Sequence, residues 1–521
     1  MKKILLLILF LLLLSACTPK DIITVDENGY LIVNGVKTEY YVQNPETFDI
    51  KIGINNDGYW VINNEVTTHP QNEKLVTEIK NGYLHVFGVQ TNIKIEVKEK
   101  KVSPNYQNHG GLFPDVKPEM LASQYWIDLY NNCDELIMTK EEINSFNEKT
   151  INTKNTNTVN LLNYPNTITK NELIEKINKY QIPQYNYLDN KIITSEDKNF
   201  LLEKRNINAI DDVVIVRYGI ITNNTSMRSF PTDKRITSTL DGDFDYFQET
   251  GLKIGDGVII LHQTEDKMWS FVRCENYEGW IKTKDIGFCS KEVFQDFLNT
   301  ENFIVVLANK LRLFNSSYTK ENADITLYMG TKIPILKNPP MTIDRRSTIG
   351  CYVALIPRTN TDGNLNLISV PIPMTEDVHN GYLDYTITNL FNQAIKLLGT
   401  PYGWGDMDFN RDCSSTVSAI YKCFGFVMPR NTSNQDDLPG KSLSITNALP
   451  GSLIFTPGHV LLYLGKVDGH HYVLHNFSKY RTSPTSETYQ AMCCHITTLD
   501  LYRANGATYL YSISKIIALD N

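Results

Sequence analysis

The spacing of hydrophobic residues changes several times along the chain, and each change marks a different kind of element. Residues 22–101 contain three apolar runs, and each begins with a tyrosine that follows an Asn-Gly or Asp-Gly pair: Tyr30, Tyr59 and Tyr83. Such pairs are typical of tight hairpin turns, and apolar residues that alternate with polar ones are typical of strands. This segment is therefore predicted to be a small antiparallel β module.

The next segment, residues 118–206, has apolar positions at helical spacing, interrupted by loops rich in Asn and Thr. This pattern predicts a helical segment with four helices, at 119–131, 139–148, 170–179 and 196–205.

Short strands separated by glycine turns follow. Residues 207–290 predict strands at 213–218, 227–229, 257–263, 268–275 and 279–282. Several short strands in so few residues are typical of a small barrel of SH3 type. Residues 291–376 repeat this pattern and predict a second SH3-like barrel, with strands at 305–307, 311–313, 332–336 and 352–356.

The last segment, residues 383–521, contains both the helical and the strand-like spacing of apolar residues. Helices are predicted at 383–398 and after Cys413, where Val417, Ile420, Tyr421 and Phe424 recur at helical spacing. Strands are expected at 453–455, 460–465, 471–475, 499–503 and 509–517. At 521 residues the chain is too long for one core, so we expect a multidomain α+β protein.

Composition and the N-terminus narrow the class of protein. The net charge is −8, so the chain lacks the excess of positive charge that is typical of nucleic-acid-binding proteins. Lys2-Lys3 and the apolar run at 4–14 indicate a secretory signal that is too short to span a bilayer. Leu14-Ser15-Ala16-Cys17 resembles a bacterial lipoprotein box, which implies removal of residues 1–16 and acylation of Cys17. Ordinary signal cleavage is the alternative.

These features predict an exported protein anchored to a bacterial membrane by lipid, on its periplasmic or its outer face. The nine cysteines show no dense spacing, so a disulfide scaffold is not expected. The sequence indicates neither a disulfide pairing nor an oligomeric state.

Cys413, at the start of a predicted helix, is the strongest candidate for chemistry. A thiol needs a nearby base to act as a nucleophile, and His459 and His475 lie on the strands that follow. The helix dipole and free N–H groups at a helix start should lower the pKa of the thiol and could hold an oxyanion. A buried structural cysteine is the alternative.

The turn between the two strands decides whether His459 and His475 meet. A wide loop with a bulge at Gly469 would place both on one face, whereas a tight Asp468-Gly469 turn would separate them. We expect the wide loop, with His470 and His471 exposed in it. A zinc site formed by these histidines is a weaker hypothesis, because the sequence lacks H-E-x-x-H and paired C-x-x-C motifs.

Four motifs together resemble the NlpC-type bacterial cell-wall cysteine peptidases. They are GTPYGWG at 399–405, RDCSS at 411–415, MPRNTSNQ at 428–435 and GHVLLYLG at 458–465. Upstream, residues 217–220, 227–232 and 247–249 resemble the first bacterial SH3 domain of multidomain members. The sequence departs from the family pattern at Asp406 and Ser415, where glycine is common.

The resemblance implies a papain-like catalytic domain that hydrolyses the γ-D-glutamyl–diamino acid bond of peptidoglycan stem peptides with a free N-terminal L-Ala. It implies Cys413 as nucleophile, His459 as base and His475 as the residue that orients the base. Residues implied to line the substrate pocket are Tyr402, Trp404, Asp412 and Ser414. Asp412 would pair with the substrate ammonium, and no metal or organic cofactor would be needed.

Two other functions fit parts of the sequence. One is a non-catalytic cell-wall-binding lipoprotein, and the other is an amidase or acyltransferase on the same fold. The intact set of Cys413, His459 and His475 favours the peptidase.

Overall fold

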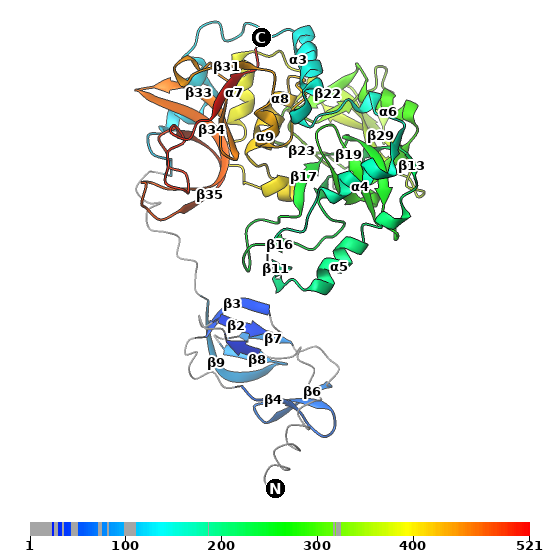
Figure 1. Cartoon of the computed structure of the whole chain (residues 1–521), viewed down its shortest axis with the longest axis vertical. Coiled ribbons are helices and arrows are strands. Elements are labelled where there is room, and N and C mark those ends of the chain that lie inside the picture. Colours follow the sequence, from blue (N-terminus) through cyan, green and yellow to red (C-terminus); the bar gives the residue numbers. More distant parts are fainter. Residues whose placement is uncertain are drawn as a thin grey trace. The chain divides into compact units, whose positions relative to one another are not determined.

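The computed structural model describes residues 23–25, 30–33, 36–42, 50–70, 76–80, 83–97, 111–185, 187–315, 318 and 325–520. The chain divides into two compact units, Met1–Asn108 and His109–Asn521 (Figure 1). The predicted signal at 1–16 and the acylated Cys17 lie outside the described residues. Among the helices that are described, none is long and apolar enough to cross a membrane.

The first unit consists of antiparallel strands that share one core. A six-stranded sheet has the order β1-β2-β3-β9-β8-β7, and β4, β5 and β6 form a separate three-stranded sheet. The strand bounds are β1 Ile23–Val25, β2 Tyr30–Val33, β3 Val36–Val42, β4 Ile52–Ile54, β5 Tyr59–Ile62, β6 Glu65–Pro70, β7 Thr77–Lys80, β8 Tyr83–Val86 and β9 Val89–Val97. The strands β2, β5 and β8 begin at the three expected tyrosines, which confirms this part of the sequence pattern.

Four helices follow in the second unit: α2 Ser123–Ile127, α3 Lys140–Asn152, α4 Lys170–Asn178 and α5 Ser195–Glu203. The last three begin after a threonine (Thr139, Thr169 or Thr194) that forms a capping box with an acidic residue three positions later. Such reciprocal hydrogen bonds satisfy free N–H groups at a helix start. The first helix is shorter than the expected 119–131, because a 3₁₀ turn at Pro118–Leu121 precedes it.

The buried side chains of this helical segment belong to the cores of two neighbours. Trp126 and Phe146 pack into the core of the C-terminal domain. Leu173, Ile177 and Leu201 pack into the core of the first barrel. The segment therefore ties these two domains together by apolar burial.

The first barrel is a seven-stranded sheet of order β17-β15-β20-β19-β18-β14-β21. Its strands are β14 Arg217–Ile221, β15 Thr225–Arg228, β17 Gln248–Leu252, β18 Gly257–Gln263, β19 Trp269–Arg273, β20 Glu278–Lys282 and β21 Ile286–Cys289. Phe247, Phe271 and Trp280 are fully buried in its core. The helix α6 (Lys291–Leu298) follows the barrel and packs on β14.

The region that follows has its own core, around Ile304, Val306, Leu327 and Ile356. Its strands are β22 Phe303–Val306, β23 Lys310–Arg312, β24 Thr326–Tyr328, β25 Lys332–Pro334, β26 Thr342–Ile343, β27 Arg346–Ser347, β28 Cys351–Thr359, β29 Leu365–Pro373 and β30 Val378–Asn380. They form several small sheets, in contrast to the single sheet of the first barrel. Each strand expected here is present, with shifts of a few residues at its ends.

The C-terminal domain packs helices on a six-stranded antiparallel sheet of order β31-β36-β32-β33-β34-β35. Its helices are α7 Ile387–Ile395, α8 Cys413–Lys422 and α9 Thr432–Gln435. Its strands are β31 Lys441–Ser442, β32 Leu453–Thr456, β33 His459–Val467, β34 His470–Tyr480, β35 Tyr489–Thr498 and β36 Lys515–Ala518. Figure 1 shows these strands in orange to red and the helices in yellow to gold.

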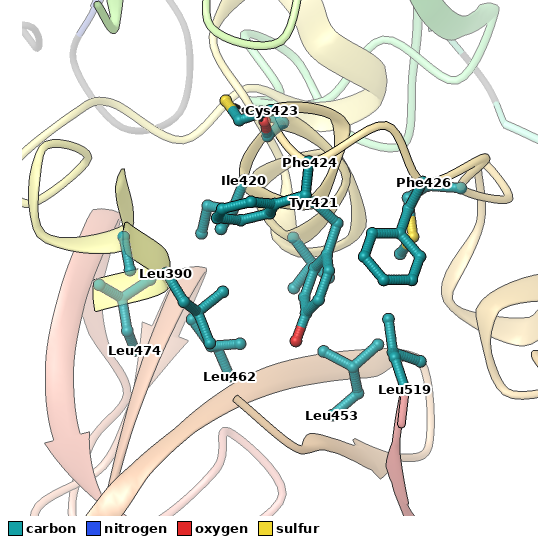
Figure 2. Close-up of a cluster of buried hydrophobic side chains, with 14 of the residues drawn as sticks. Leu390, Ile420, Tyr421, Cys423, Phe424, Phe426, Leu453, Leu462, Leu474 and Leu519 are labelled. Carbon is teal, nitrogen blue, oxygen red and sulfur yellow. Dashed lines mark hydrogen bonds between the residues drawn. The ribbon is translucent and has the colours of Figure 1, made fainter. Parts of the chain in front are cut away.

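Apolar packing between α8 and the sheet fixes the position of the helix. Figure 2 shows Ile420 and Tyr421 of the helix, and Phe424 just after its end, above Leu453 and Leu462 of the sheet. All five side chains are buried, and the Tyr421 hydroxyl donates a hydrogen bond to the Gly451 carbonyl at 2.5 Å. The helical spacing that the sequence predicts after Cys413 is thus confirmed.

One expected strand near the C-terminus is wrong, and another is confirmed only in part. Residues 499–503 form turns and an isolated bridge at Tyr502, whereas the expected strand 509–517 is a strand only from residue 515, where β36 begins. The sequence missed β35, which pairs with β34 on one side, makes backbone hydrogen bonds to residues 399–402 on the other, and carries few strongly apolar residues. The side chains of Leu499 and Leu501 are buried beside the sheet, although these residues do not form a strand. Their burial accounts for the apolar pattern that predicted a strand here.

Candidate active site

Cys413 is the first residue of α8, and its thiol lies among polar groups at the helix start. Asp412 caps the helix by accepting a hydrogen bond from the Ser415 amide at 2.9 Å. The Cys413 sulfur lies 3.5 Å from the Thr432 hydroxyl and receives hydrogen bonds from the amides of Ser414 and Val460. The side chain is buried, and these donors surround the position where negative charge would develop on the thiol or on a bound carbonyl.

The expected lowering of the thiol pKa is wrong for the free protein. Burial, and then the negative charge of Asp412, raise the pKa of Cys413 above its ordinary value. The hydrogen bonds from Thr432 and the two amides oppose this rise without cancelling it. Desolvation therefore outweighs the hydrogen bonds at the helix start, and the thiol needs a base to take its proton.

His459 and His475 form a direct pair. His459 Nε2 lies 2.8 Å from His475 Nδ1, and His475 Nε2 lies 2.9 Å from the Thr497 hydroxyl. His475 also stacks on Phe477, with ring centroids 4.1 Å apart and planes 4° from parallel. His459 precedes Val460, whose amide reaches the Cys413 sulfur, and α8 packs on β33 and β34, the strands that carry the imidazole pair.

The turn that joins β33 to β34 differs from the expected wide loop. Val467 pairs with His470, so Asp468 and Gly469 form a tight two-residue turn, and both have positive φ. The imidazoles still share one face, because the register shifts by one residue between Tyr463 and Gly465. A bulge inside the strand thus replaces the bulge that we expected at Gly469.

His470 and His471 are strand residues, which corrects the expectation of an exposed loop. Both lie at the start of β34 and are half-buried. His470 pairs with Asp500 at 2.7 Å, and His471 Nδ1 lies 2.9 Å from the Tyr463 hydroxyl. Among the described residues, no three metal-ligating side chains gather around a common point.

Burial keeps both imidazoles neutral. Burial and the nearby Arg503 lower the pKa of His459 to about 3, and burial with the neighbouring His459 and His495 lowers the pKa of His475 well below its ordinary value. His459 is therefore unprotonated near neutral pH and a weak base in the free protein, and His475 can fix its tautomer through the 2.8 Å contact.

These pKa shifts predict a loss of stability in acid. The unfolded chain takes up protons on both histidines below pH 6.5, whereas the folded chain does not until much lower pH. The free energy of unfolding should therefore fall from pH 7 to pH 5, by up to about 2 kcal/mol for each imidazole. Urea titrations at the two pH values measure this loss.

The variant His475→Asn should make that loss smaller, because one buried imidazole is gone. His470→Asn is the matched control, since its partner Asp500 raises the pKa of His470 and its protonation therefore favours the folded state. A loss of equal size in wild type and His475→Asn would contradict the assigned pKa shift.

Asp412 is held by a residue to which sequence reasoning gave no role. Arg430 Nη2 donates to Asp412 Oδ2 at 2.8 Å, and Arg430 Nη1 donates to Asp412 Oδ1 at 3.2 Å. Ser414 joins this group, since its hydroxyl donates to Asp412 and accepts from Arg430, both at 3.0 Å. The sequence shows the motif that contains Arg430, but it does not show that Arg430 pairs with Asp412.

The two aromatic pocket candidates lie against the first barrel. The ring of Trp404 is 5.4 Å from that of Phe244 and 5.6 Å from that of Tyr246, measured between centroids. Trp404 keeps 37% of its surface exposed, so part of its ring faces open space. Burial raises the pKa of Tyr402, and the nearby Cys413 adds to this effect.

The barrel also contributes an acidic group beside Arg430. The Tyr277 hydroxyl donates to Glu249 Oε2 at 2.5 Å, and burial raises the pKa of the Glu249 carboxyl despite the nearby Arg430. Arg430 Nε donates to the Thr250 hydroxyl at 2.6 Å, which joins the barrel to the C-terminal domain. Sequence reasoning noted the motif at 247–249 but did not assign Glu249 or Tyr277 to the site.

A thiol at a helix start, with an imidazole pair on the adjacent strands, is the arrangement of a cysteine-peptidase site. Comparison with known families agrees with this class. Residues 399–497 match the NlpC/P60 family, and residues 235–282 match an SH3 domain of the SH3b1 type. Residues 399–497 thus form a domain that resembles the NlpC/P60 family, and a domain that resembles the SH3b1 type lies ahead of it in the chain.

Two curated relatives match parts of the chain. Dipeptidyl-peptidase 6 of Lysinibacillus sphaericus is 35% identical over 79 residues, which are 15% of this chain and 29% of the relative. Gamma-D-glutamyl-L-lysine dipeptidyl-peptidase of Bacillus cereus is 24% identical over 208 residues, which are 37% of this chain and 55% of the relative. The chain thus spans 55% or less of the length of either relative.

A solved structure shares the fold over a longer range. An NlpC/P60 endopeptidase from Photobacterium damselae subsp. piscicida aligns with 73% of this chain and 90% of its own, with a TM-score of 0.59 at 19% identity. At this identity the similarity shows the fold.

Proposed function

We propose that this protein is a lipid-anchored peptidoglycan hydrolase that cleaves the γ-D-glutamyl–diamino acid amide bond of stem peptides with a free N-terminal L-Ala. The proposal is supported by the Cys413 thiol at the start of α8 and by the His459–His475 pair on the strands against which α8 packs, in a domain that matches this family. The Bacillus cereus relative is named for the same type of bond, which supports the choice of substrate.

The proposed reaction begins when His459 takes the proton of the Cys413 thiol as the sulfur attacks the γ-carbonyl carbon. The amides of Ser414 and Val460 already donate to the sulfur, so they lie close to where an oxyanion would form. His459 then gives the proton to the leaving amine, and a thioester remains on Cys413. Water hydrolyses this thioester, with His459 again acting as the base.

His475 acts through His459. Its contact at 2.8 Å favours one tautomer of His459, and its stacking on Phe477 fixes its own ring. This is the role of the third member in other catalytic triads.

The free amine of the substrate would bind where the first barrel meets the catalytic domain. Glu249 supplies a carboxyl there, held by Tyr277 and close to Arg430. Asp412 already pairs with Arg430, so we assign the main contact with the ammonium to Glu249 and a supporting contact to Asp412. Tyr402 and Trp404 would cover the small side chain of L-Ala.

Blocking the substrate amine tests this assignment. N-acetylation of the tripeptide L-Ala-γ-D-Glu-diamino acid removes an ammonium that pairs with Glu249, at a cost of about 2 kcal/mol, or roughly thirtyfold in kcat/KM. In Glu249→Gln, the free tripeptide should show a similar rise in KM with little change in kcat. Equal cleavage of free and acetylated peptides by wild type would contradict the assignment.

The anchor and the second barrel complete the proposal. Acylation at Cys17 would hold the catalytic domain near a bacterial membrane, since each buried methylene group adds about 0.8 kcal/mol to membrane binding. The region around residues 303–380 would be a second SH3-like domain that supports the first.

Mass spectrometry of a digest of the same tripeptide tests the reaction. The proposal predicts cleavage after the Glu residue by wild type and none by Cys413→Ala. Intact sacculi serve as a second substrate, because an amidase would release complete stem peptides from the sugar. A non-catalytic wall-binding protein would leave both substrates unchanged.

A further inference from the structure

A short segment ahead of the helices of the second unit lies against the sheet of the C-terminal domain. It comprises residues 111–117, which we call the strap, and it begins just after the start of that unit at His109. The strap contains neither helix nor strand. It also lies outside the stretches that match the NlpC/P60 family and the SH3b1 domain. A role of the strap in the site would therefore be additional to what those matches describe.

Two hydrogen bonds fix the strap in place. The hydroxyl of Tyr472, a buried residue of β34, donates to the Asp115 carbonyl at 2.7 Å. The Val116 amide donates to the Phe113 carbonyl at 3.1 Å, which closes a turn within the strap. The turn and the bond from a buried strand residue together hold Phe113 against β34.

The ring of Phe113 packs among three aromatic side chains of the sheet. Its centroid lies 5.4 Å from that of Phe477, 5.0 Å from that of Tyr480 and 5.1 Å from that of His495. All three contacts are tilted or edge-on, which are favoured arrangements for aromatic pairs at these distances. Phe477 and Tyr480 are buried, whereas Phe113 is half-buried, so Phe113 forms the outer layer of this aromatic cluster.

Two of these neighbours of Phe113 also border His475. Phe477 stacks on the imidazole of His475, with centroids 4.1 Å apart. His495 is paired with His475 across β34 and β35, so the two side chains lie on the same face of the sheet. His475 is 1% exposed and Phe477 is 3% exposed. Phe113 is thus one residue removed from His475 along two separate routes.

Titratable groups surround His475 on its other sides. His459 of β33 is its hydrogen-bond partner, and the ring of Tyr509 lies edge-on at 5.0 Å. The Arg503 guanidinium lies over Tyr509, 5.8 Å from the ring centroid. Burial, and then His459 and His495, lower the pKa of His475. Because burial is the largest cause, water admitted beside this imidazole would raise its pKa.

We propose that Phe113 is a positioning residue for the proposed reaction, because it holds Phe477 and His495 against the imidazole of His475. The Phe113 ring would exclude water from this side of His475 and keep Phe477 in its stacked position. His475 Nδ1 would thereby stay within 2.8 Å of His459 Nε2. The inference rests on the function proposed above for Cys413 and the two histidines. It makes the imidazole pair dependent on a segment near the opposite end of the second unit.

Two alanine variants of the strap test this role in the full-length protein. Phe113→Ala should lower kcat for the tripeptide at least about tenfold and leave KM within about twofold, because the base loses its orientation and the substrate pocket is unchanged. Val116→Ala is the matched control, since Val116 is also half-buried but packs against the core that α8 shares with the sheet. It should keep kcat within about twofold of wild type. Phe113→Leu, which keeps an apolar side chain over Phe477, should recover most of the loss.

Nitrogen NMR of histidine-labelled protein gives a readout that needs no turnover. The His475 signals, assigned with His475→Asn, should stay constant from pH 7 to pH 5 in wild type and in Val116→Ala. In Phe113→Ala they should move toward the values of a protonated ring over the same range. Circular dichroism checks that each variant is folded. If Phe113→Ala does not fold, Phe113→Val, which also lacks the ring, replaces it in both measurements.

A loss of kcat together with the NMR change, in the Phe113 variant alone, supports the proposal. A kcat of Phe113→Ala within about twofold of wild type, an equal loss in Val116→Ala, or unchanged His475 signals would each overturn it. A wild type that does not cleave the tripeptide would refute the proposed function. The NMR comparison would still decide in that case whether Phe113 fixes His475.

Discussion

Replacement of Cys413 by serine should lower the turnover of the tripeptide at least about a thousandfold, because a hydroxyl at this position has almost no anionic character near neutral pH. The surroundings already raise the pKa of the thiol, so a hydroxyl would be harder still for His459 to deprotonate. The change replaces one atom with another of similar size, so the fold should be kept. Steady-state kinetics of release of the diamino acid measures the effect.

Cys351→Ser is the matched control for this prediction. Cys351 is a half-buried thiol at the start of β28, outside the residues that surround Cys413. Its replacement should leave turnover within about twofold of wild type, since surface changes away from a site have small effects. Activity of Cys413→Ser within roughly tenfold of wild type would remove this thiol from the mechanism.

The largest expected effect on stability follows from the Asp412–Arg430 pair. The side chain of Arg430 is 5% exposed and that of Asp412 is 13% exposed, so Asp412→Asn leaves a buried guanidinium without its charged partner. Loss of one partner of a buried pair costs about 3–5 kcal/mol. The more distant Asp406 carboxylate, 3.7 Å from Arg430, remains in the variant, and the asparagine can still cap α8, so the loss should come from the charge of Asp412. Urea denaturation at pH 7 measures the change in the free energy of unfolding.

The pair of Lys396 with Asp377 provides a control of equal geometry. Both ion pairs have a nitrogen–oxygen distance of 2.8 Å, but the side chains of Lys396 and Asp377 are 32% and 44% exposed. Asp377→Asn should therefore cost about 1 kcal/mol or less. Equal losses for the two variants would show that burial does not set the strength of the Asp412–Arg430 pair.

Helices and strands around the site were predictable where a pattern of neighbouring residues was enough to define them. The apolar spacing after Cys413 gave α8, and the polar histidine before an apolar run gave the start of β33. The motifs at 399–405, 411–415 and 458–465 also indicated the family to which residues 399–497 belong. In each case the residues that carry the signal are close together in the sequence.

Features that depend on distant parts of the chain were not predictable. The contact between His459 and His475 depends on a bulge at Tyr463–Gly465, which apolar alternation does not reveal. The pairing of Arg430 with Asp412 joins two loops, and its bond to Thr250 joins two domains. The pKa of Cys413 was misjudged for the same reason, because the sequence shows the helix start but not how deeply neighbouring domains bury it.

The most direct test of the central claim is to trap the covalent intermediate. Wild type would be mixed with the tripeptide, quenched in acid, digested with pepsin and examined by mass spectrometry. The account predicts an L-Ala-γ-D-Glu thioester on the peptide that contains Cys413, and its absence from Cys413→Ala. A burst of free diamino acid without this adduct, or an adduct on another residue, would contradict the account.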